Sequence, residues 1–342
     1  MSSININGRM VGDGHPAYII AEMSANHAGS MERALELIHV AKESGADCVK
    51  IQTYTPDTMT IDCGNEYFHI GKGTWEGENL YSLYRKAHTP WEWQAQLRDE
   101  AARVGIDFLS TAFDHTSVDF LEELGVRFYK IASFELVDIP LLEYIASRNK
   151  PVILSTGMGT IEEITEAVNA IYSTGNRQLA LMKCSSAYPA KSEEMNLATI
   201  RDLSARFDIP VGLSDHSMGA FSAATAVAMG ACIVEKHFCG SRAIENPESV
   251  FSMEPDEFKK MVDEIRIVEK ALGKVTYELS EKQKRSREDG RSLFVVKNMK
   301  EGEIFTEENV RSIRPAFGLH TMYFDEIMGR RARTDISKGT PL

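Results

Sequence analysis

The segment from Gly212 to Phe238 most constrains what this chain can fold into. Two short apolar runs, 209–213 and 231–234, flank a stretch of small, helix-forming residues at 220–229. This pattern predicts a strand, a helix and a second strand. A helix between two strands returns the chain to the same end of a sheet, so the strands are expected to be parallel neighbours.

The same alternation recurs along most of the chain. Further strands are expected at 17–21, 48–52, 108–111, 128–133, 152–156 and 179–184. Helices are expected at 92–104, 117–124, 141–147, 161–172, 197–207 and 255–272, and a helix capped by Ser30 follows the first strand. Residues 2–14 are expected to form an N-terminal hairpin. Eight strands that alternate with helices predict an α/β fold, the closed (β/α)8 TIM barrel.

Polar residues gather where the predicted strands end. They are Glu22, Lys50, Gln52, Thr111, Lys130, Ser133, Ser155, Ser185, Ser186, Ser214, His216, Glu235 and His237. The active sites of such barrels form at the carboxyl ends of the strands. Helix capping explains some of the serines and threonines. It does not explain lysines inside apolar strands, because a buried lysine needs a partner. Lys50 and Lys130 with the nearby hydroxyls therefore predict an anion-binding cradle.

Two histidines follow the two strands of the first segment, and they suggest a metal site. Side chains alternate faces along a strand, so Ser214 and His216 share a face, as do Glu235 and His237. Neighbouring strands lie ~4.8 Å apart, so the two imidazoles could hold one divalent ion and leave positions open for substrate. Two unrelated histidines, one in a loop and one in the core, remain the alternative.

The second connection, Tyr54 to Thr89, is long and contains glycines and aromatic residues. Long loops in compact domains are usually functional. A lid or substrate wall and a plain surface insertion are both compatible with its composition.

Charge and cysteine content limit the functional classes. The net charge of −12 argues against general binding to nucleic acid or to an anionic membrane. The five cysteines show no paired zinc spacing and fit reduced thiols. We see neither a signal-peptide pattern nor an apolar run long enough to span a membrane, so a cytoplasmic location is expected.

The C-terminal part differs from the barrel in composition. Residues 1–280 are assigned to the barrel, the charged stretch 281–291 to a linker, and 292–342 to a small β-rich domain. Two related polar turns, at 300–306 and 337–342, suggest an internal pseudo-repeat. About fifty residues give little core, so this domain is expected to dock against another surface.

These motifs together resemble the sialic acid (nonulosonic acid) synthase family. The matching stretches are Ile20–Glu22 with Asn26–Gly29, Val49–Gln52, Tyr129–Ser133, Ser155–Thr160, Gly212–Ser217 and Glu235–Phe238. The tail, with Arg314-Pro315 and Gly318, resembles the family's antifreeze-like (SAF) domain. Within the family, the stretches 73–75, 80–84 and 89–93 are most similar to the pseudaminic acid synthases.

The resemblance implies an enzyme of the transferase class and assigns residues to roles. It implies condensation of phosphoenolpyruvate, water and an open-chain 2,4-diacetamido-2,4,6-trideoxy hexose of the altrose type. The products are a nine-carbon 2-keto acid and phosphate, formed by C–O cleavage. The implied catalytic residues are Glu22, Glu235, His216 and His237, and the two histidines bind a divalent metal, manganese first, magnesium or cobalt otherwise. Phosphoenolpyruvate is assigned to Lys50, Thr111, Lys130, Ser133, Ser155, Ser186 and Ser214, and the sugar to Gln52, Tyr188, Glu248 and Arg314. A domain-swapped homodimer, in which Arg314 completes the partner's sugar pocket, is also implied.

Two positions depart from the family's pattern. Glu248 stands where the family usually has Asp, and the longer side chain changes the reach to sugar hydroxyls. Ser186 stands where sialic acid synthases often have Asn, which shortens a phosphate contact or recruits a water.

Several alternatives stay open at this stage. The sugar could be the substrate of an N-acetylneuraminate or legionaminate synthase. Glu22 and Glu235 could be general base and charge stabiliser, or structural carboxylates paired with the lysines. A Schiff-base aldolase would use Lys130 or Lys50 as its nucleophile. The tail could be an ice- or glycan-binding module, although its few threonines argue against ice binding.

Overall fold

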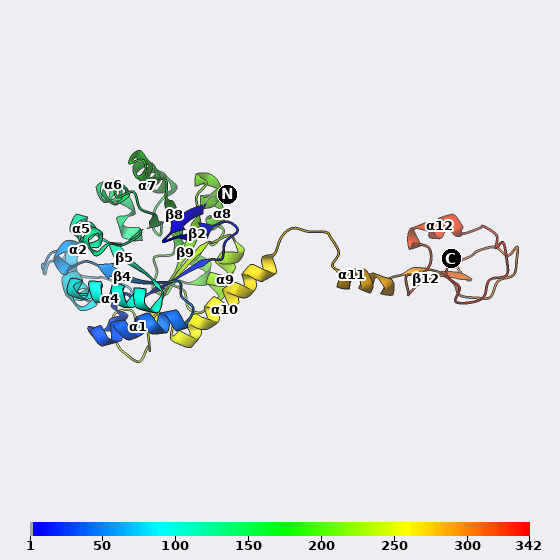
Figure 1. Ribbon diagram of the computed structural model, residues 1–342, viewed down its shortest axis with the longest axis horizontal. Helices are drawn as coiled ribbons and strands as arrows, with labels where there is room; N and C mark the ends of the chain where they lie inside the picture. The colour runs from blue at the N-terminus through cyan, green and yellow to red at the C-terminus, as the bar shows by residue number, and fades with distance from the viewer. Residues whose placement is uncertain (1–2) are drawn as a thin grey trace. The chain divides into compact units, whose positions relative to one another are not determined.

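The computed structural model describes residues 3–342, and the chain forms two compact units, Met1–Gly273 and Lys274–Leu342. The first unit is a closed barrel of parallel strands, paired in the order β10-β3-β4-β5-β6-β7-β8-β9 (Figure 1). Its strands are β3 (Tyr18–Glu22), β4 (Cys48–Thr53), β5 (Asp107–Ala112), β6 (Tyr129–Ile131), β7 (Val152–Ser155), β8 (Leu179–Cys184), β9 (Val211–Asp215) and β10 (Ile233–His237). The prediction of a (β/α)8 barrel is confirmed.

Helices surround the barrel and follow the predicted cadence (Figure 1). They are α1 (Met31–Glu43), α4 (Trp91–Val104), α5 (His115–Leu124), α6 (Ile139–Ala146), α7 (Ile161–Ser173), α8 (Thr199–Phe207), α9 (Phe221–Ala228) and α10 (Pro255–Leu272). Capping residues determine where these helices begin and end. Ser30 accepts a hydrogen bond from the Arg33 N–H, as predicted, and Asp114 and Thr160 form capping boxes. Gly125 ends α5 in the left-handed region, with φ of 78°.

The barrel strands bury both faces. Outward-facing residues pack against the helices in two large clusters, while a separate inner cluster fills the barrel axis with residues such as Ile20, Leu109, Phe128 and Ile153. Burial on both faces explains why the strands read as nearly continuous apolar runs. The few polar residues that face the barrel axis therefore stand out from these apolar runs, and they lie at the carboxyl ends of the strands.

The predicted N-terminal hairpin is confirmed as β1 (Ser3–Ile6) and β2 (Arg9–Gly12). Asn7 and Gly8 both have positive φ, 47° and 88°, which fits a tight two-residue hairpin turn. Ile4, Ile6 and Val11 join the inner cluster of the barrel. The hairpin therefore plugs the amino-terminal end of the barrel and leaves the carboxyl end for the site.

The long second connection contains two short helices, α2 (Pro56–Met59) and α3 (Leu80–Ala87). The N-cap residues Thr55 and Asn79 begin them. The rest of this connection is irregular and carries the glycine- and tryptophan-containing segment 71–77.

The C-terminal unit begins earlier than the sequence predicts. The assignment of 1–280 to the barrel and 281–291 to a linker is wrong at its boundaries, because the first unit ends at Gly273. Residues 274–280 are exposed, and 281–286 form a helix, α11 (Glu281–Ser286). Ser280 and Gln283 make a capping box at its start, a signal that the charge content of this stretch conceals.

The C-terminal unit pairs β11 (Ser292–Val295) with β12 (Val310–Ile313) and adds the short helix α12 (Phe324–Ile327). Its two small clusters centre on Leu293, Val310 and Ile327 and on Val295, Met299 and Ala332. The two related turns lie side by side, since Met299 and Ile336 exchange backbone hydrogen bonds and Lys300 pairs with Asp335. This arrangement fits the predicted pseudo-repeat.

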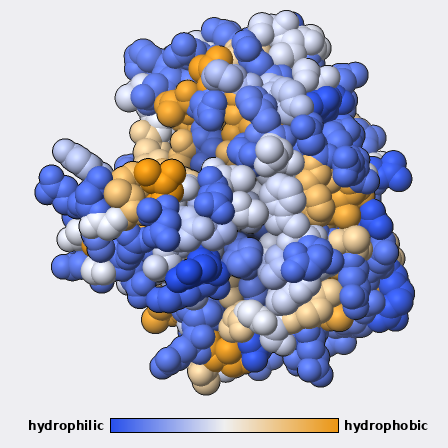
Figure 2. All heavy atoms as spheres, turned by 90° about the vertical axis from the view of Figure 1, so that its left-hand side faces the viewer, coloured by the Kyte–Doolittle hydropathy of each residue, from blue (hydrophilic) through white to orange (hydrophobic). Residues whose placement is uncertain are grey.

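The surface of the protein is largely hydrophilic on the face that can be followed in Figure 2. Figure 2 shows one face, where hydrophilic residues dominate and hydrophobic residues form separate patches. Among the described residues, no helix combines the length and hydrophobicity that crossing a bilayer requires.

The hairpin plug makes a stability prediction. Ile6 is fully buried, so Ile6→Ala should lower the free energy of unfolding by about 2–5 kcal/mol, because it leaves a cavity at the closed end of the barrel. Ser3→Ala, at an exposed position of the same strand, should change it by less than about 0.5 kcal/mol. Urea denaturation of the two variants measures both values; equal stabilities would show that the hairpin is not part of the barrel core.

Candidate active site

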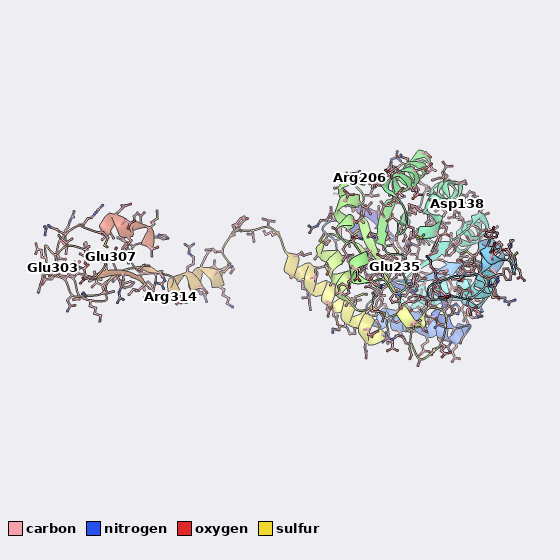
Figure 3. The ribbon with its side chains drawn as sticks, turned by 180° about the vertical axis from the view of Figure 1, so that it is seen from behind. Asp138, Arg206, Glu235, Glu303, Glu307 and Arg314 are labelled. Carbon is pink, nitrogen blue, oxygen red and sulfur yellow. The ribbon has the colours of Figure 1, made fainter. Side chains whose placement is uncertain are left out.

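Barrel closure brings the predicted polar residues to the carboxyl end of the strands. Glu22, Lys50, Lys130, Ser155 and Glu235 are all at least 95% buried there. Figure 3 shows Glu235 inside the ring of strands, whereas Arg206 lies among the surrounding helices. The site is thus an enclosed polar layer above an apolar barrel core.

Lys50 lies between two carboxylates. Its Nζ is 2.7 Å from Glu22 Oε2 and 3.4 Å from Glu235 Oε1, and it donates to Thr111 Oγ1 at 3.2 Å. Gln52 donates to Glu22 Oε1, and Ser214 donates to Glu235 Oε1. Lys50 is therefore neutralised by protein carboxylates, which fits the alternative that pairs them with the lysines, and its assignment to the anion site stays a prediction.

The two carboxyl groups have different acidities. Burial raises the pKa of Glu22 to about 7, although Lys50 opposes the shift. Burial also disfavours ionisation of Glu235, but Lys130 and Lys50 outweigh it and hold its pKa below the ordinary value. Glu22 is therefore poised to exchange a proton near neutral pH, and Glu235 is poised to stay charged.

Lys130 has a different environment. Its Nζ donates to Ser155 Oγ at 2.7 Å and to the Ile131 carbonyl at 3.1 Å. No carboxylate within residues 3–342 lies at ion-pair distance from it. Burial lowers the pKa of Lys130. Glu235 attracts its charge only from beyond ion-pair distance, so this lysine is the better anchor for an anion.

A hydroxyl-lined cradle lies around Gly157. The Gly157 N–H donates to Ser133 Oγ at 3.1 Å, and Ser186 Oγ is buried without a hydrogen-bond partner in the described part of the chain. A Cβ on Gly157 would come within 2.2 Å of Ser186 Oγ and 2.6 Å of Ser133 Oγ. Convergent hydroxyls and an unsatisfied buried oxygen are what a phosphate group requires.

The two histidines lie together, with ring centroids 5.3 Å apart, and both are more than 90% buried. The Nδ1 of His216 is 3.0 Å from the Ser185 carbonyl, which can only accept, so Nδ1 carries the proton and Nε2 is left free. Burial, helped by His216 and Lys50, lowers the pKa of His237 well below its ordinary value. Its Nδ1 has no hydrogen-bond partner among the described residues.

Buried imidazoles with a free ring nitrogen fit a divalent metal ion. Burial disfavours the charged form of His216, but Cys184 and the Ser185 carbonyl outweigh it and raise its pKa, so a metal bound there would displace a proton. No group of three or more His, Cys, Asp or Glu in residues 3–342 has metal-binding geometry. A metal on His216 and His237 would therefore take its other ligands from water and substrate, which is the open arrangement of a catalytic ion.

Aromatic side chains pack against the two histidines. Tyr188 stacks on His216 with centroids 4.1 Å apart, and Phe251 meets His237 edge-on at 5.0 Å. Trp75 contacts both Tyr188 and Phe251. Neither Trp75 nor Phe251 was a predicted site residue, although a tryptophan in a glycine-containing loop is itself a signal.

Hydrogen bonds tie the long second connection to this wall. Trp75 Nε1 donates to the Pro247 carbonyl at 2.8 Å, and the Thr74 hydroxyl donates to the Tyr188 carbonyl. Contacts with loops after β8 and β10 favour a substrate wall over a plain surface insertion.

Glu248 lies beside the histidines. Its Oε2 accepts from the Ala25 N–H at 2.9 Å and is 3.8 Å from His237 Nδ1. Burial raises the pKa of Glu248. The fourth predicted sugar residue, Arg314, is exposed on the C-terminal unit (Figure 3).

Known proteins are similar to this chain in sequence and in fold. Residues 37–277 match the NeuB family, and residues 290–342 match the SAF domain. The pseudaminic acid synthase of Campylobacter jejuni is 46% identical over 325 residues, which covers 95% of each chain. The chain belongs to the NeuB family. It is therefore an enzyme of the phosphoenolpyruvate-using, transferase type.

More distant relatives of this NeuB-family enzyme carry other names. The N,N'-diacetyllegionaminic acid synthase of Legionella pneumophila is 35% identical, over 100% of this chain and 98% of the relative. A crystal structure of N-acetylneuraminic acid synthetase from Leptospira borgpetersenii superposes with a TM-score of 0.75 at 30% identity. It covers 83% of this chain and 95% of that chain.

The cradle of the NeuB-family barrel makes a direct prediction. Gly157→Ala should raise the dissociation constant of phosphoenolpyruvate roughly tenfold or more, since its methyl group displaces Ser133 and Ser186 and removes a charge-assisted contact worth ~1.5–3 kcal/mol. Isothermal titration calorimetry measures the change.

Gly64→Ala is the matched control. Gly64 is exposed, and a Cβ there meets nothing within 4 Å. This variant should bind as the unaltered protein does. Unchanged affinity in Gly157→Ala would place the anion elsewhere.

Proposed function

We propose that this enzyme condenses phosphoenolpyruvate with an open-chain 2,4-diacetamido-2,4,6-trideoxy hexose of the altrose type. The products are a nine-carbon 2-keto acid, as in pseudaminic acid synthesis, and phosphate. The carrying observation is that a buried lysine, Lys130, with its hydroxyl cradle and two buried histidines share one barrel mouth. The 46% identity to a pseudaminic acid synthase favours this sugar over that of the legionaminate enzyme, at 35% identity.

The proposed roles follow from the charges. Lys130, Ser155, Ser133 and Ser186 hold the enol phosphate. His216 and His237 would hold a divalent metal, which would supply Lewis-acid polarisation of the sugar aldehyde. C3 of phosphoenolpyruvate attacks the aldehyde carbon, whose oxygen takes up a proton and becomes a hydroxyl group. Water adds at C2 and gives up one proton. The C2–O bond to phosphate then breaks while the new C2 hydroxyl loses its proton to leave the keto group.

Glu235 and Glu22 divide the remaining work. The ionised Glu235 carboxylate stabilises positive charge that develops at C2 during the attack. Glu22, with its raised pKa, takes the proton of the attacking water. Lys50 holds both carboxylates in place, and Gln52 fixes Glu22 from the other side.

One observation favours a second candidate. Lys130 is buried, with no described carboxylate at ion-pair distance, and its pKa is lowered, which is what a Schiff-base nucleophile requires. An aldolase on this barrel would form an imine between Lys130 and pyruvate. Borohydride with pyruvate would then label Lys130 covalently, whereas the synthase gives no such adduct.

Phosphate release tests the main proposal. The purified protein is given phosphoenolpyruvate, manganese and a panel of 2-acetamido and 2,4-diacetamido hexoses. The altrose-type 6-deoxy sugar should give the highest kcat/KM, with 18O from water found in the product keto acid and not in phosphate, because C–O cleavage leaves the bridging oxygen with phosphate. Preference for another sugar corrects the substrate, and 18O in phosphate refutes the cleavage mode.

Metal dependence is a separate expectation. Excess chelator should abolish turnover, and manganese, cobalt or magnesium should restore it, since two imidazoles bind a divalent ion only moderately. His216→Ala and His237→Ala should stay folded and lose both activity and manganese binding. Full turnover in chelator would rule out the metal mechanism.

We also propose a homodimer in which each C-terminal unit covers the partner's barrel mouth. The loops at the mouth expose large apolar side chains, Phe134, Met158, Met218 and Val250. The C-terminal unit exposes Phe317, Leu319, Met322 and Tyr323 close in sequence to Arg314. Apolar surface on both units supports docking. The C-terminal unit has a small core, so burying this surface against a partner would stabilise it.

We propose the cytoplasm as the location, because the five cysteines are all unpaired.

Subunit mixing tests the dimer. Arg314→Ala and His216→Ala proteins are each expected to be nearly inactive, because each lacks one half of every site. After subunit exchange, each mixed dimer should hold one site with both residues intact, and activity should return. Continued inactivity after verified exchange would place Arg314 in its own chain's site or outside any site.

A further inference from the structure

A buried ion pair lies directly behind the two histidines. Asp215 on β9 and Lys236 on β10 are cross-strand partners, with Lys236 Nζ 2.8 Å from Asp215 Oδ2. Their side chains are 0% and 1% exposed, respectively. Each is one position away from a histidine, so each points to the opposite face of its strand, away from the barrel axis. The proposed chemistry uses neither residue.

The pair is fully hydrogen-bonded. Asp215 Oδ1 accepts from the Ser217 N–H at 2.9 Å and from Ser217 Oγ at 2.7 Å. Asp215 Oδ2 accepts from Ser222 Oγ at 2.5 Å as well as from Lys236. Lys236 Nζ also donates to the carbonyls of Ser217, at 2.5 Å, and Gly219, at 3.2 Å. The network thus joins β9, the loop after it, the start of α9 and β10.

The residues next to both histidines in the chain belong to this network. His216 lies between Asp215 and Ser217, which are bonded to each other, and His237 directly follows Lys236. Rotation of either strand end would break several bonds at once. A buried pair is a weak source of net stability compared with apolar side chains of similar size. Its hydrogen-bonding pattern instead holds two strand ends in one relative geometry.

We propose that Asp215 and Lys236 are positioning residues that set the relative orientation of His216 and His237 and so the affinity for a divalent metal. This inference rests on the proposed metal site. Groups behind metal ligands typically change metal affinity by roughly 10- to 100-fold when replaced. The anion cradle takes Lys130 from β6, Ser155 from β7 and Ser186 from the loop after β8, and within residues 3–342 it shares no hydrogen bond with the network.

The test replaces the pair by apolar side chains of similar size, Asp215→Leu with Lys236→Met. The double variant should keep a Tm near that of the unaltered protein, because no buried charge is left unpaired. Its dissociation constant for Mn²⁺, measured by electron paramagnetic resonance without substrate, should rise roughly 10- to 100-fold. Its affinity for phosphoenolpyruvate should change less than about threefold.

Two further variants keep the outcome decisive. Ser222→Ala removes one bond to Asp215 and should weaken Mn²⁺ binding measurably, and it decides the matter if the double variant does not fold. Leu142→Ala, a fully buried cavity variant on α6, should lower Tm without changing Mn²⁺ affinity.

The outcomes separate this inference from the proposed function. Mn²⁺ affinity equal to that of the unaltered protein in a folded double variant overturns the positioning role alone. Absence of Mn²⁺ binding in the unaltered protein overturns the metal site and the positioning role together.

Discussion

The pairing of the last barrel strand with the first is the contact on which the site depends. β10 pairs with β3 from Ile233 opposite Tyr18 to His237 opposite Glu22. This pairing closes the sheet and removes its edges. It also aligns the strand ends around one axis, so residues from both ends of the barrel sequence share one enclosed layer. Without closure, Lys50 would lack its second carboxylate, Glu235.

Charge is distributed unevenly within that layer. Lys50 is held by Glu22 and Glu235, while Lys130 donates to a hydroxyl and a carbonyl oxygen. Burial strengthens both kinds of interaction because the surroundings screen charge weakly. One side of the layer therefore favours an anion. The other side, with His216 and His237, favours a metal and a polarised carbonyl.

Residues outside this polar layer hold its side chains in place. The hairpin with Ile4, Ile6 and Val11 closes the amino-terminal end of the barrel. Trp75 links three loops above the carboxyl end. The Asp215–Lys236 pair holds two strand ends from behind. Rigid support of this kind suits chemistry that needs two reactants held in line.

Much of the fold could be predicted from the sequence because its signals are local. Apolar runs, helix periodicity and caps such as Ser30 depend on neighbours within a few residues. They predicted the eight strands, their order and the polar residues at their ends, including His216 and His237. The boundary after Gly273 was missed because charge composition masked the Ser280–Gln283 capping box.

Tertiary structure alone decided which of these side chains meet. Both lysines look alike in sequence, each inside an apolar strand. Only the register of β3, β4 and β10 puts Lys50 between two carboxylates, whereas no described carboxylate reaches ion-pair distance of Lys130. The contacts of Trp75 and the Asp215–Lys236 network were likewise not predictable, because distances between side chains on different strands and loops are fixed by barrel closure and not by spacing along the chain.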